Sequence, residues 1–383
     1  MKVSALFAED ARHQPVLTGL RGWAALWVFL FHLWFQSGKP TFEFVIAGIR
    51  LDVTPPIAIG FAGVPIFFVL SGFLLSLPFA EWQAGLRRRP ALGKYFLHRI
   101  ARVFPAYYAQ LAILLAIAAI TGGLSAVPDP AALLRHLGML FVPPPVGTSP
   151  LNGVWWTLPV EFSFYLALPF LAFLLRPGRW WWLTLASLAS MYLWRHAVVL
   201  RLADAPISER VITSWQLPGA FDMFGLGMLA AVLHVNRRRL PSWLSRALGH
   251  RALAASAVAT LLVAAYWLAG DRQHFWADYP IFYLWTPAVG TATALLILTG
   301  VGGDRLANAL FGNRPMVFLG LVSYSLYLWH LPIIDWLIAL PGLQPLMGQG
   351  FTARLAVTLA ATLAVATLSY VAVERPVMRW RAS

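Results

Sequence analysis

Long apolar stretches separated by short polar segments repeat along almost the whole chain. An α-helix needs about 20 mostly apolar residues to cross a bilayer. The pattern therefore predicts an all-α fold, a polytopic membrane helical bundle with about ten transmembrane helices. The ten predicted spans are 17–35, 57–79, 99–121, 154–176, 180–200, 212–235, 250–270, 281–302, 316–340 and 352–374. A further apolar piece, 131–142, is too short to span and is expected to be re-entrant or interfacial.

Composition agrees with a membrane location. The chain of 383 residues is 59% hydrophobic and only 11% charged, and its mean hydropathy is +0.68, whereas soluble domains are roughly a quarter charged. There is no cysteine, which excludes a disulfide framework, a zinc–thiolate site and a catalytic cysteine. Residues 1–19 lack the apolar core and cleavage site of a signal peptide.

The 29 basic residues outnumber the 15 acidic ones. In a membrane protein this excess indicates cytoplasmic loops rather than nucleic-acid binding. If the N-terminus is cytoplasmic, the inner loops and the tail hold most of the arginines, so we expect one membrane domain over 1–383 with both termini cytoplasmic. The Pro-rich outer segment 141–153 is a candidate lid or substrate mouth. In 63–75, Gly63, Ser71 and Gly72 are expected to allow close helix contact.

Ionisable residues inside the predicted spans are few, and such residues are functional candidates because they are costly in lipid. Arg21 and His32 share the first span. At about 100° per residue their separation leaves them roughly 20° apart on one helix face, and about 16 Å apart along the axis. Arginine suits phosphate and histidine suits proton transfer. The alternatives are that Arg21 reaches to the inner interface and that His32 bonds a neighbouring helix.

Glu161 in the fourth span is expected at a depth similar to that of His32, where its carboxylate could orient the imidazole. The alternative is a structural ion pair with an arginine. Arg99 and Arg102 are three residues apart and share a face at the cytoplasmic mouth of the third span. They are candidates for phosphate binding, or serve only topology and lipid headgroups. Other ionisable groups are left without a role: Arg195, Asp222, His330 and Asp335. "SYSLYLWH", 323–330, is interpreted as a polar packing seam.

Six motifs, in order along nearly the whole chain, together resemble the acyltransferase-3 family of membrane acyltransferases. They are "LTGLRGWAALWVFLFH", "GVPIFFVLSGFLL", "RIARVFPAYY", "WWTLPVEFSFYL", "SYSLYLWH" and "VERP". By this resemblance, Arg21 and His32 match the essential Arg–His motif of the family, and Arg99 and Arg102 match its arginine pair. The chain stops at Ser383 shortly after the tenth predicted span, which implies the stand-alone form without a C-terminal hydrolase-like domain.

The resemblance implies an O-acyltransferase in the bacterial inner membrane. Such an enzyme moves an acyl group, usually acetyl, from cytoplasmic acyl-coenzyme A to a hydroxyl of a carbohydrate or glycolipid, for example lipopolysaccharide O-antigen or exopolysaccharide. The implied partners are acetyl-coenzyme A, the acceptor and membrane lipid, with no metal and no nucleic acid.

In the expected mechanism, Arg21, Arg99 and Arg102 hold the phosphates, and His32, oriented by Glu161, takes the proton of the attacking hydroxyl. An acyl-His intermediate is the alternative mechanism.

The competing functional class is a proton-coupled transporter or flippase of a glycan precursor, because buried His and Glu side chains can form a proton relay. Transporters often show inverted repeats or paired broken helices, and the sequence shows neither. A scaffold with a decayed site is a third possibility, against which the intact His32, Arg21 and Glu161 argue.

Overall fold

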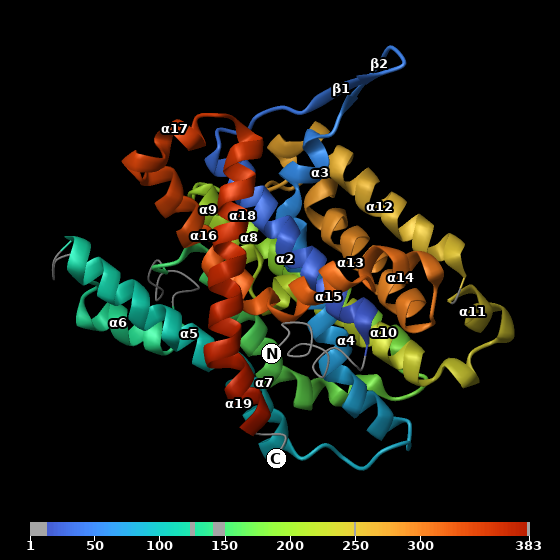
Figure 1. The fold of residues 1–383 in the computed structure, drawn as a ribbon. Coiled ribbons are helices and arrows are strands. Elements are labelled where there is room, and N and C mark those ends of the chain that lie inside the picture. The colour runs from blue at the N-terminus through green and yellow to red at the C-terminus, as the bar shows by residue number, and fades with distance from the viewer. Residues whose placement is uncertain (1–13, 123–126, 141–149, 249, 381–383) are drawn as a thin grey trace. The chain divides into compact units, whose positions relative to one another are not determined.

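The computed structural model describes residues 14–122, 127–140, 150–248 and 250–380 (Figure 1). Within these residues, nine helical stretches are long and apolar enough to cross a membrane, and a broken pair of helices makes up to ten. This confirms an all-α fold with about ten membrane helices. The nine stretches are Pro15–Gln36 (α2), Gly60–Gln83 (η1, α4), Leu92–Gly122 (α5), Gly153–Leu175 (η3, α7, η4), Trp180–Arg201 (α8), Leu217–Val235 (α10), Arg251–Gly270 (α12), Pro280–Val301 (α13) and Phe351–Arg379 (α18, η8, α19).

The ninth predicted span, 316–340, is not one continuous helix. It is divided into α15 (Arg314–Leu321) and α16 (Ser323–Ala339). At the break the Ser323 hydroxyl donates a hydrogen bond to the carbonyl of Gly320 at 2.8 Å. A side-chain donor of this kind satisfies a carbonyl that a helix end leaves without a backbone partner. Apolar pattern alone does not show such a break, because its residues are all compatible with a membrane helix.

Two helix starts also differ from the predicted positions. α5 begins at Leu92, about two turns before the predicted start at 99, so the arginines of its motif lie inside the helix. The predicted span 212–235 is divided between α9 (Ile207–Ser214) and α10. α10 starts with Pro218 in its first turn, where the missing N–H of proline is tolerated.

The short apolar piece before the Pro-rich loop contains α6 (Pro130–Leu137), which is too short to cross a membrane. The Asp129 side chain caps it by accepting a hydrogen bond from the Ala132 N–H at 2.9 Å. The predicted lid, 141–153, lies outside the described residues except for 150–153.

A β-hairpin that the hydrophobic pattern does not predict follows α2. β1 (Glu43–Ile46) pairs antiparallel with β2 (Ile49–Asp52). Ala47 and Gly48 between them have φ angles of 51° and 79°, and two successive positive φ angles are what a type I′ turn requires. Alanine rarely adopts a positive φ, so the usual sequence signal for such a hairpin is missing.

The described chain forms two compact units, which we describe separately. Unit 1 is Met1–Pro90 with Ala167–Ser323, and unit 2 is Ala91–Leu166 with Tyr324–Ser383. α7 (Thr157–Leu171) begins in unit 2 and ends in unit 1. The elements of unit 1 not yet given are α3 (Thr54–Ala58), η1 (Gly60–Ala62), α4 (Gly63–Gln83), η4 (Ala172–Leu175), η5 (Arg237–Arg239), α11 (Ser242–Ala247), η6 (Arg272–His274) and α14 (Arg305–Phe311). Those of unit 2 are η3 (Gly153–Trp156), η7 (Pro341–Leu343) and α17 (Gln344–Met347).

Glycine contacts bring the helices of unit 1 together. A Cβ atom on Gly72 of α4 would lie 2.3 Å from the Phe224 carbonyl oxygen, and one on Gly227 of α10 would lie 2.1 Å from that of Val69. Two helices that approach this closely need glycine at the contact. A Cβ on Gly63 would lie 2.3 Å from a backbone oxygen of α2. The predicted packing role of Gly63 and Gly72 is confirmed.

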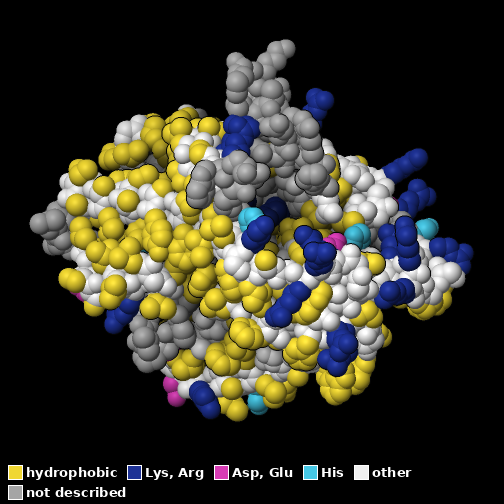
Figure 2. Space-filling model, turned by 90° about the horizontal axis from the view of Figure 1, so that it is seen from below, with side chains coloured by type: hydrophobic (Ala, Val, Ile, Leu, Met, Phe, Trp, Pro, Cys, Tyr) yellow, Lys and Arg dark blue, Asp and Glu magenta, His cyan; other side chains and the backbone are white. Residues whose placement is uncertain are grey.

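Three consecutive arginines, Arg237–Arg239, follow the end of α10 in unit 1. Val16 at the start of α2 fills the space beside Gly300 at the end of α13, and Arg237 lies next to Gly302. Arg237 also donates to the Ser245 carbonyl at 3.1 Å. Figure 2 shows many Lys and Arg side chains and few Asp or Glu side chains on the face that it views. Such a distribution is typical of the cytoplasmic side of a membrane protein.

A proline organises the interior of unit 2. Pro332 inside α16 has no N–H, so the helix provides no donor for the carbonyl of Leu328, four residues earlier. Gln110 of α5 and Asn152 each donate a side-chain N–H to this carbonyl, both at 2.7 Å. Gln110 in turn accepts a hydrogen bond from the Trp155 indole at 2.8 Å. Three separate chain segments are thereby joined at one buried carbonyl.

Candidate functional site

Arg21 and His32 both lie on α2, an uninterrupted helix from Pro15 to Gln36. The predicted common helix is therefore present, and its regular geometry puts the two side chains on one face. Both side chains are half-buried. His32 lies one turn before the C-terminal end of α2, with the ring of Phe31 edge-on at 5.0 Å.

The imidazole of His32 is held from within its own helix. Its Nδ1 lies 3.0 Å from the carbonyl oxygen of Val28. A carbonyl oxygen only accepts, so Nδ1 carries a proton in this contact and Nε2 of the neutral ring is the basic nitrogen. The Val28 carbonyl of α2 thus orients the His32 imidazole, a role that we expected for the Glu161 carboxylate.

Glu161 lies one turn after the start of α7 and is half-buried. It belongs to unit 2, whereas His32 belongs to unit 1. The expected contact between this carboxylate and the imidazole therefore stays a prediction, as does a joint phosphate site of Arg21 with the arginines of α5.

Arg99 and Arg102 lie on neighbouring turns of α5, as predicted from their spacing. The guanidinium carbon of Arg99 lies 5.9 Å from the ring centre of Tyr165, within the range of a cation–π contact. Tyr165 itself is buried, and its carbonyl accepts a hydrogen bond from the Tyr95 hydroxyl at 3.1 Å. This carbonyl is available because Pro169, four residues later, has no N–H. Arg99 therefore lies on a fixed aromatic surface.

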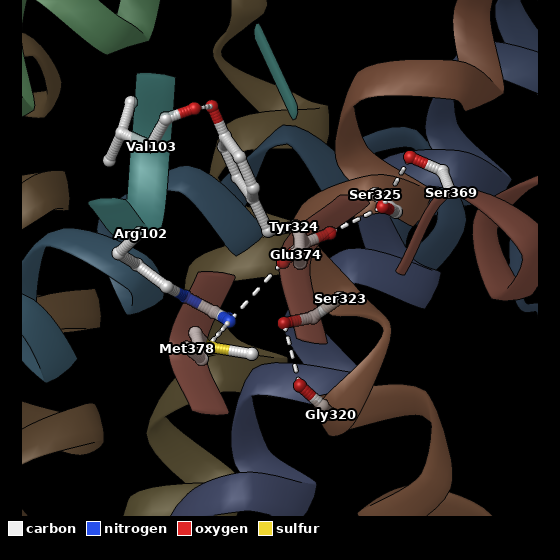
Figure 3. A network of polar contacts seen from close by, with 9 residues as sticks. All are labelled: Arg102, Val103, Gly320, Ser323, Tyr324, Ser325, Ser369, Glu374 and Met378. Carbon is white, nitrogen blue, oxygen red and sulfur yellow. Dashed lines mark hydrogen bonds and ion pairs between the residues drawn. The ribbon is translucent and has the colours of Figure 1, made fainter. Parts of the chain in front are cut away.

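Arg102 is held by a buried carboxylate (Figure 3). Its Nη1 donates to Glu374 Oε2 at 3.2 Å and to Met378 Sδ at 3.3 Å. The side chain of Glu374 is 2% exposed and that of Arg102 is 20% exposed. The positive charge of Arg102 is therefore balanced by a carboxylate inside unit 2.

Two serines complete the contacts of this carboxylate (Figure 3). The hydroxyl of Ser325 in α16 is hydrogen-bonded to Glu374 Oε1. The Ser325 hydroxyl oxygen also lies 2.9 Å from the hydroxyl oxygen of Ser369, at the end of α18 (Phe351–Ser369). Ser325 has one hydroxyl proton. When it donates this proton to the carboxylate, the Ser369 hydroxyl supplies the proton for the second bond. Both oxygens of Glu374 are then satisfied, as a buried carboxylate requires.

Glu374 is not among the site residues predicted from the sequence. It lies in η8 (Tyr370–Glu374), a π-helical turn between α18 and α19 (Arg375–Trp380). Such turns are rare and are frequent at functional sites. The available signal was the "VERP" motif, which places a carboxylate at the end of the last span.

Asp222 and Arg195, which were left without a role, form a buried ion pair in unit 1. The Nη2 atom of Arg195 is 3.8 Å from Asp222 Oδ1. Arg195 also donates to the carbonyls of Gly219 and Phe282, and Thr286 donates to Asp222 Oδ2 at 2.8 Å. These contacts join α8, α10 and α13, and they indicate a structural role.

The tyrosines of α16 form the predicted polar packing seam. Tyr324 donates to the Val103 carbonyl and Tyr327 to the Val154 carbonyl, both at 2.9 Å. His330 is fully buried, and its Nδ1 lies 2.7 Å from the Tyr327 carbonyl. Across the described ranges, no group of three or more His, Asp or Glu side chains is arranged to hold a metal ion.

Comparisons with known proteins give a consistent family. A family model described as Acyl_transf_3, acyltransferase domain, matches residues 15–372. The chain is 29% identical over 391 residues to the acyltransferase MdmB of Streptomyces mycarofaciens, covering 95% of this chain and 92% of that protein. It is 27% identical over 332 residues to the exopolysaccharide production protein ExoZ of Rhizobium meliloti, covering 84% and 90%.

A third relative is longer than this chain. The peptidoglycan O-acetyltransferase OatA of Listeria monocytogenes is 26% identical over 394 residues, which cover 96% of this chain but 56% of that protein. No solved structure gives a significant match. The family match includes all five predicted site residues and most of the described helices. This protein is therefore an integral membrane enzyme that belongs to the acyltransferase-3 family.

Proposed function

We propose that this protein is a membrane O-acyltransferase that moves an acyl group, in the simplest case acetyl, from cytoplasmic acetyl-coenzyme A to a hydroxyl of a carbohydrate or glycolipid. The observation that carries the proposal is the family match over residues 15–372, which includes His32, Glu161 and the three candidate arginines. We further propose that the protein lies in the bacterial inner membrane with both termini in the cytoplasm. The three arginines Arg237–Arg239 that follow α10 support this orientation.

The donor would be held by its phosphates. Coenzyme A is a polyanion, and arginine forms paired hydrogen bonds to phosphate oxygens. Arg99 and Arg102 present two guanidinium groups from one face of α5. Arg21 near the start of α2 is the third candidate. These residues lie in the first parts of helices that, with a cytoplasmic N-terminus, start at the inner surface.

His32 is proposed as the general base. Its Nε2 removes the proton of the acceptor hydroxyl while the hydroxyl oxygen attacks the thioester carbon. The new C–O bond forms, the C–S bond breaks, and the imidazolium returns the proton to the leaving thiolate, so the products are an ester and free coenzyme A. The contact of Nδ1 with Val28 supports this role because it leaves Nε2 as the basic atom. The carboxylate of Glu161 would stabilise the imidazolium that forms.

The alternative mechanism is an acyl-His32 intermediate. Rapid-quench experiments with labelled acetyl-coenzyme A and no acceptor distinguish the two mechanisms. Direct transfer predicts no labelled protein in this experiment. A label that appears on the protein and is lost in His32→Gln would instead establish the covalent mechanism.

The acceptor class is inferred from the relatives, one named for peptidoglycan O-acetylation and another for exopolysaccharide production. We propose a surface polysaccharide or its lipid-linked precursor, such as lipopolysaccharide O-antigen or exopolysaccharide. Mass spectrometry of glycans from cells with and without the gene should show one acetylation that depends on the gene. Identical glycans in the two strains would contradict this acceptor class.

The activity itself is tested by release of coenzyme A thiol from acetyl-coenzyme A in membranes that contain the protein and a glycan acceptor. We expect acceptor-dependent release, and a loss of on the order of 10²–10⁴-fold in His32→Gln. The matched control is His196→Gln in α8, a half-exposed histidine bonded to Tyr283, which should keep the activity. Transport of a glycan precursor without thiol release would indicate the transporter class instead.

A further inference from the structure

The ion pair of Arg102 and Glu374 uses only one edge of the arginine. In the part of the chain that the structure describes, all hydrogen bonds of the Arg102 side chain are made by Nη1. A guanidinium group has five N–H donors arranged in a plane. Binding through Nη1 therefore leaves the opposite edge, formed by Nε and Nη2, to donate two parallel hydrogen bonds to one anionic group.

The carboxylate that holds this edge in place is itself fixed. Glu374 receives hydrogen bonds from Arg102 on one oxygen and from Ser325 on the other, and Ser369 supports Ser325 (Figure 3). A free arginine side chain samples many rotamers, at a cost of about 2 kcal/mol when it is ordered. Here the ordering is already achieved by contacts inside unit 2. The arginine is therefore prepared for a ligand before the ligand arrives.

Charge divides the roles of the two arginines. Arg102 and Glu374 together are close to neutral, so this pair contributes little long-range attraction for an anion. Arg99 lies one turn away over the ring of Tyr165, and in the part of the chain that the structure describes no carboxylate lies within ion-pair distance of it. Arg99 is thus suited to attract an anionic group, and Arg102 is suited to fix its orientation.

We propose that Glu374 is a positioning residue for donor binding, which holds Arg102 so that its Nε–Nη2 edge grips a phosphate group of acyl-coenzyme A. This inference rests on the proposed function, in which coenzyme A is the carrier of the acyl group. It adds a residue from the far end of the chain to the donor site, and it assigns a task to the π-helical turn in which Glu374 lies.

Substitutions of Glu374 that change either the length or the charge of its side chain, but not both, test the proposal. Glu374→Gln keeps the length of the side chain and can accept from Arg102 with its oxygen while its amide donates to Ser325, so the network closes with the serine protons reversed. Glu374→Asp keeps the charge but shortens the side chain by one methylene group. Positioning therefore predicts that Gln preserves donor affinity better than Asp. A purely electrostatic role predicts the opposite order.

The experiment measures binding of acetyl-coenzyme A to the detergent-purified full-length protein by equilibrium dialysis, together with kcat and KM. Arg102→Ala and Glu374→Ala should each weaken donor binding about tenfold or more. Their KM for acetyl-coenzyme A should rise, while kcat and the KM for the acceptor change less than about twofold. The double variant should bind no more weakly than Arg102→Ala alone, because Glu374 acts through Arg102.

The control is Glu81→Ala, which removes the carboxylate of the exposed pair with Arg87 and should leave donor binding unchanged. If Glu374→Ala fails to insert, the comparison of Glu374→Gln with Glu374→Asp still tests the proposal. The inference would be overturned if the losses of donor affinity in Arg102→Ala and Glu374→Ala multiplied in the double variant. It would also be overturned if Glu374→Asp bound acetyl-coenzyme A more tightly than Glu374→Gln. If the wild-type protein does not bind acetyl-coenzyme A at all, the proposed function fails as well. If it binds and only the Glu374 variants are without effect, this inference alone fails.

Discussion

The buried pair of Arg195 and Asp222 allows a quantitative prediction about stability. Asp222→Ala removes the carboxylate and leaves the guanidinium group of Arg195 in the interior of unit 1. The side chains of Arg195 and Asp222 are 1% and 0% exposed, so water does not replace the lost partner. Breaking a buried ion pair by removing one member costs about 3–5 kcal/mol.

The structure indicates the lower end of this range. After the substitution, Arg195 still donates from Nε to the Gly219 carbonyl at 2.9 Å and from Nη1 to the Phe282 carbonyl at 2.8 Å. The ion-pair distance of 3.8 Å also exceeds that of a hydrogen bond, so the electrostatic attraction is not maximal. We expect the free energy of unfolding to fall by about 3 kcal/mol, which is a change of on the order of 10²-fold in the unfolding equilibrium.

The assay is reversible unfolding of the purified protein in mixed micelles, with increasing sodium dodecyl sulfate and tryptophan fluorescence as the signal. The double variant Arg195→Met with Asp222→Leu removes both charges and keeps most of the volume. It should recover stability to within about 1 kcal/mol of the wild type. The exposed pair supplies the control, since Glu81→Ala should cost less than about 1 kcal/mol.

Two results would refute this reasoning. The first is a loss below about 1 kcal/mol for Asp222→Ala, which would mean that the charge of Arg195 is solvated despite its burial. The second is a double variant whose loss equals the sum of the two single losses, because independent effects show that the two groups do not interact.

The other predictions concern packing and hydrogen bonding, and the same unfolding assay checks them. Gly227→Ala should cost on the order of 1–3 kcal/mol, because its Cβ would lie 2.1 Å from the Val69 carbonyl oxygen, and an equally stable variant would contradict the close helix contact. Gly93→Ala in α5 has open space around it and should stabilise the protein by up to about 1 kcal/mol, the difference in helix propensity. Gln110→Leu leaves the buried Trp155 indole without its acceptor and should cost about 1–3 kcal/mol; a neutral effect would show that water replaces the amide.

The membrane helices could be predicted from the sequence because one requirement, an apolar length sufficient to span lipid, decides their presence. Within the described residues, nine apolar helical stretches and one broken pair correspond to the predicted spans for this reason. The break at Val322 could not be predicted in the same way. The break coincides with a hydrogen bond from Ser323 to Gly320, and hydropathy does not report such a local contact.

The candidate site was only partly predictable. The spacing of two residues along one helix is a local property, so the sequence predicted correctly that Arg21 and His32 share one helix and that Arg99 and Arg102 share another. The contact of Arg102 with Glu374 joins residues that are 272 positions apart, and no local pattern encodes such a distance. The same holds for Arg195 and Asp222, whose meeting depends on how three helices pack.

The carbonyl that Pro332 frees has a consequence for how α16 is oriented in unit 2. In a lipid environment, apolar side chains are stabilised almost as much by lipid tails as by a neighbouring helix. Apolar contacts therefore do little to select one rotation of a helix about its axis over another. A single acceptor that faces Gln110 and Asn152 discriminates sharply, since turning α16 by even one residue would carry it away from both amides. A proline that removes one hydrogen bond within α16 thus helps to fix the rotation of this helix about its own axis.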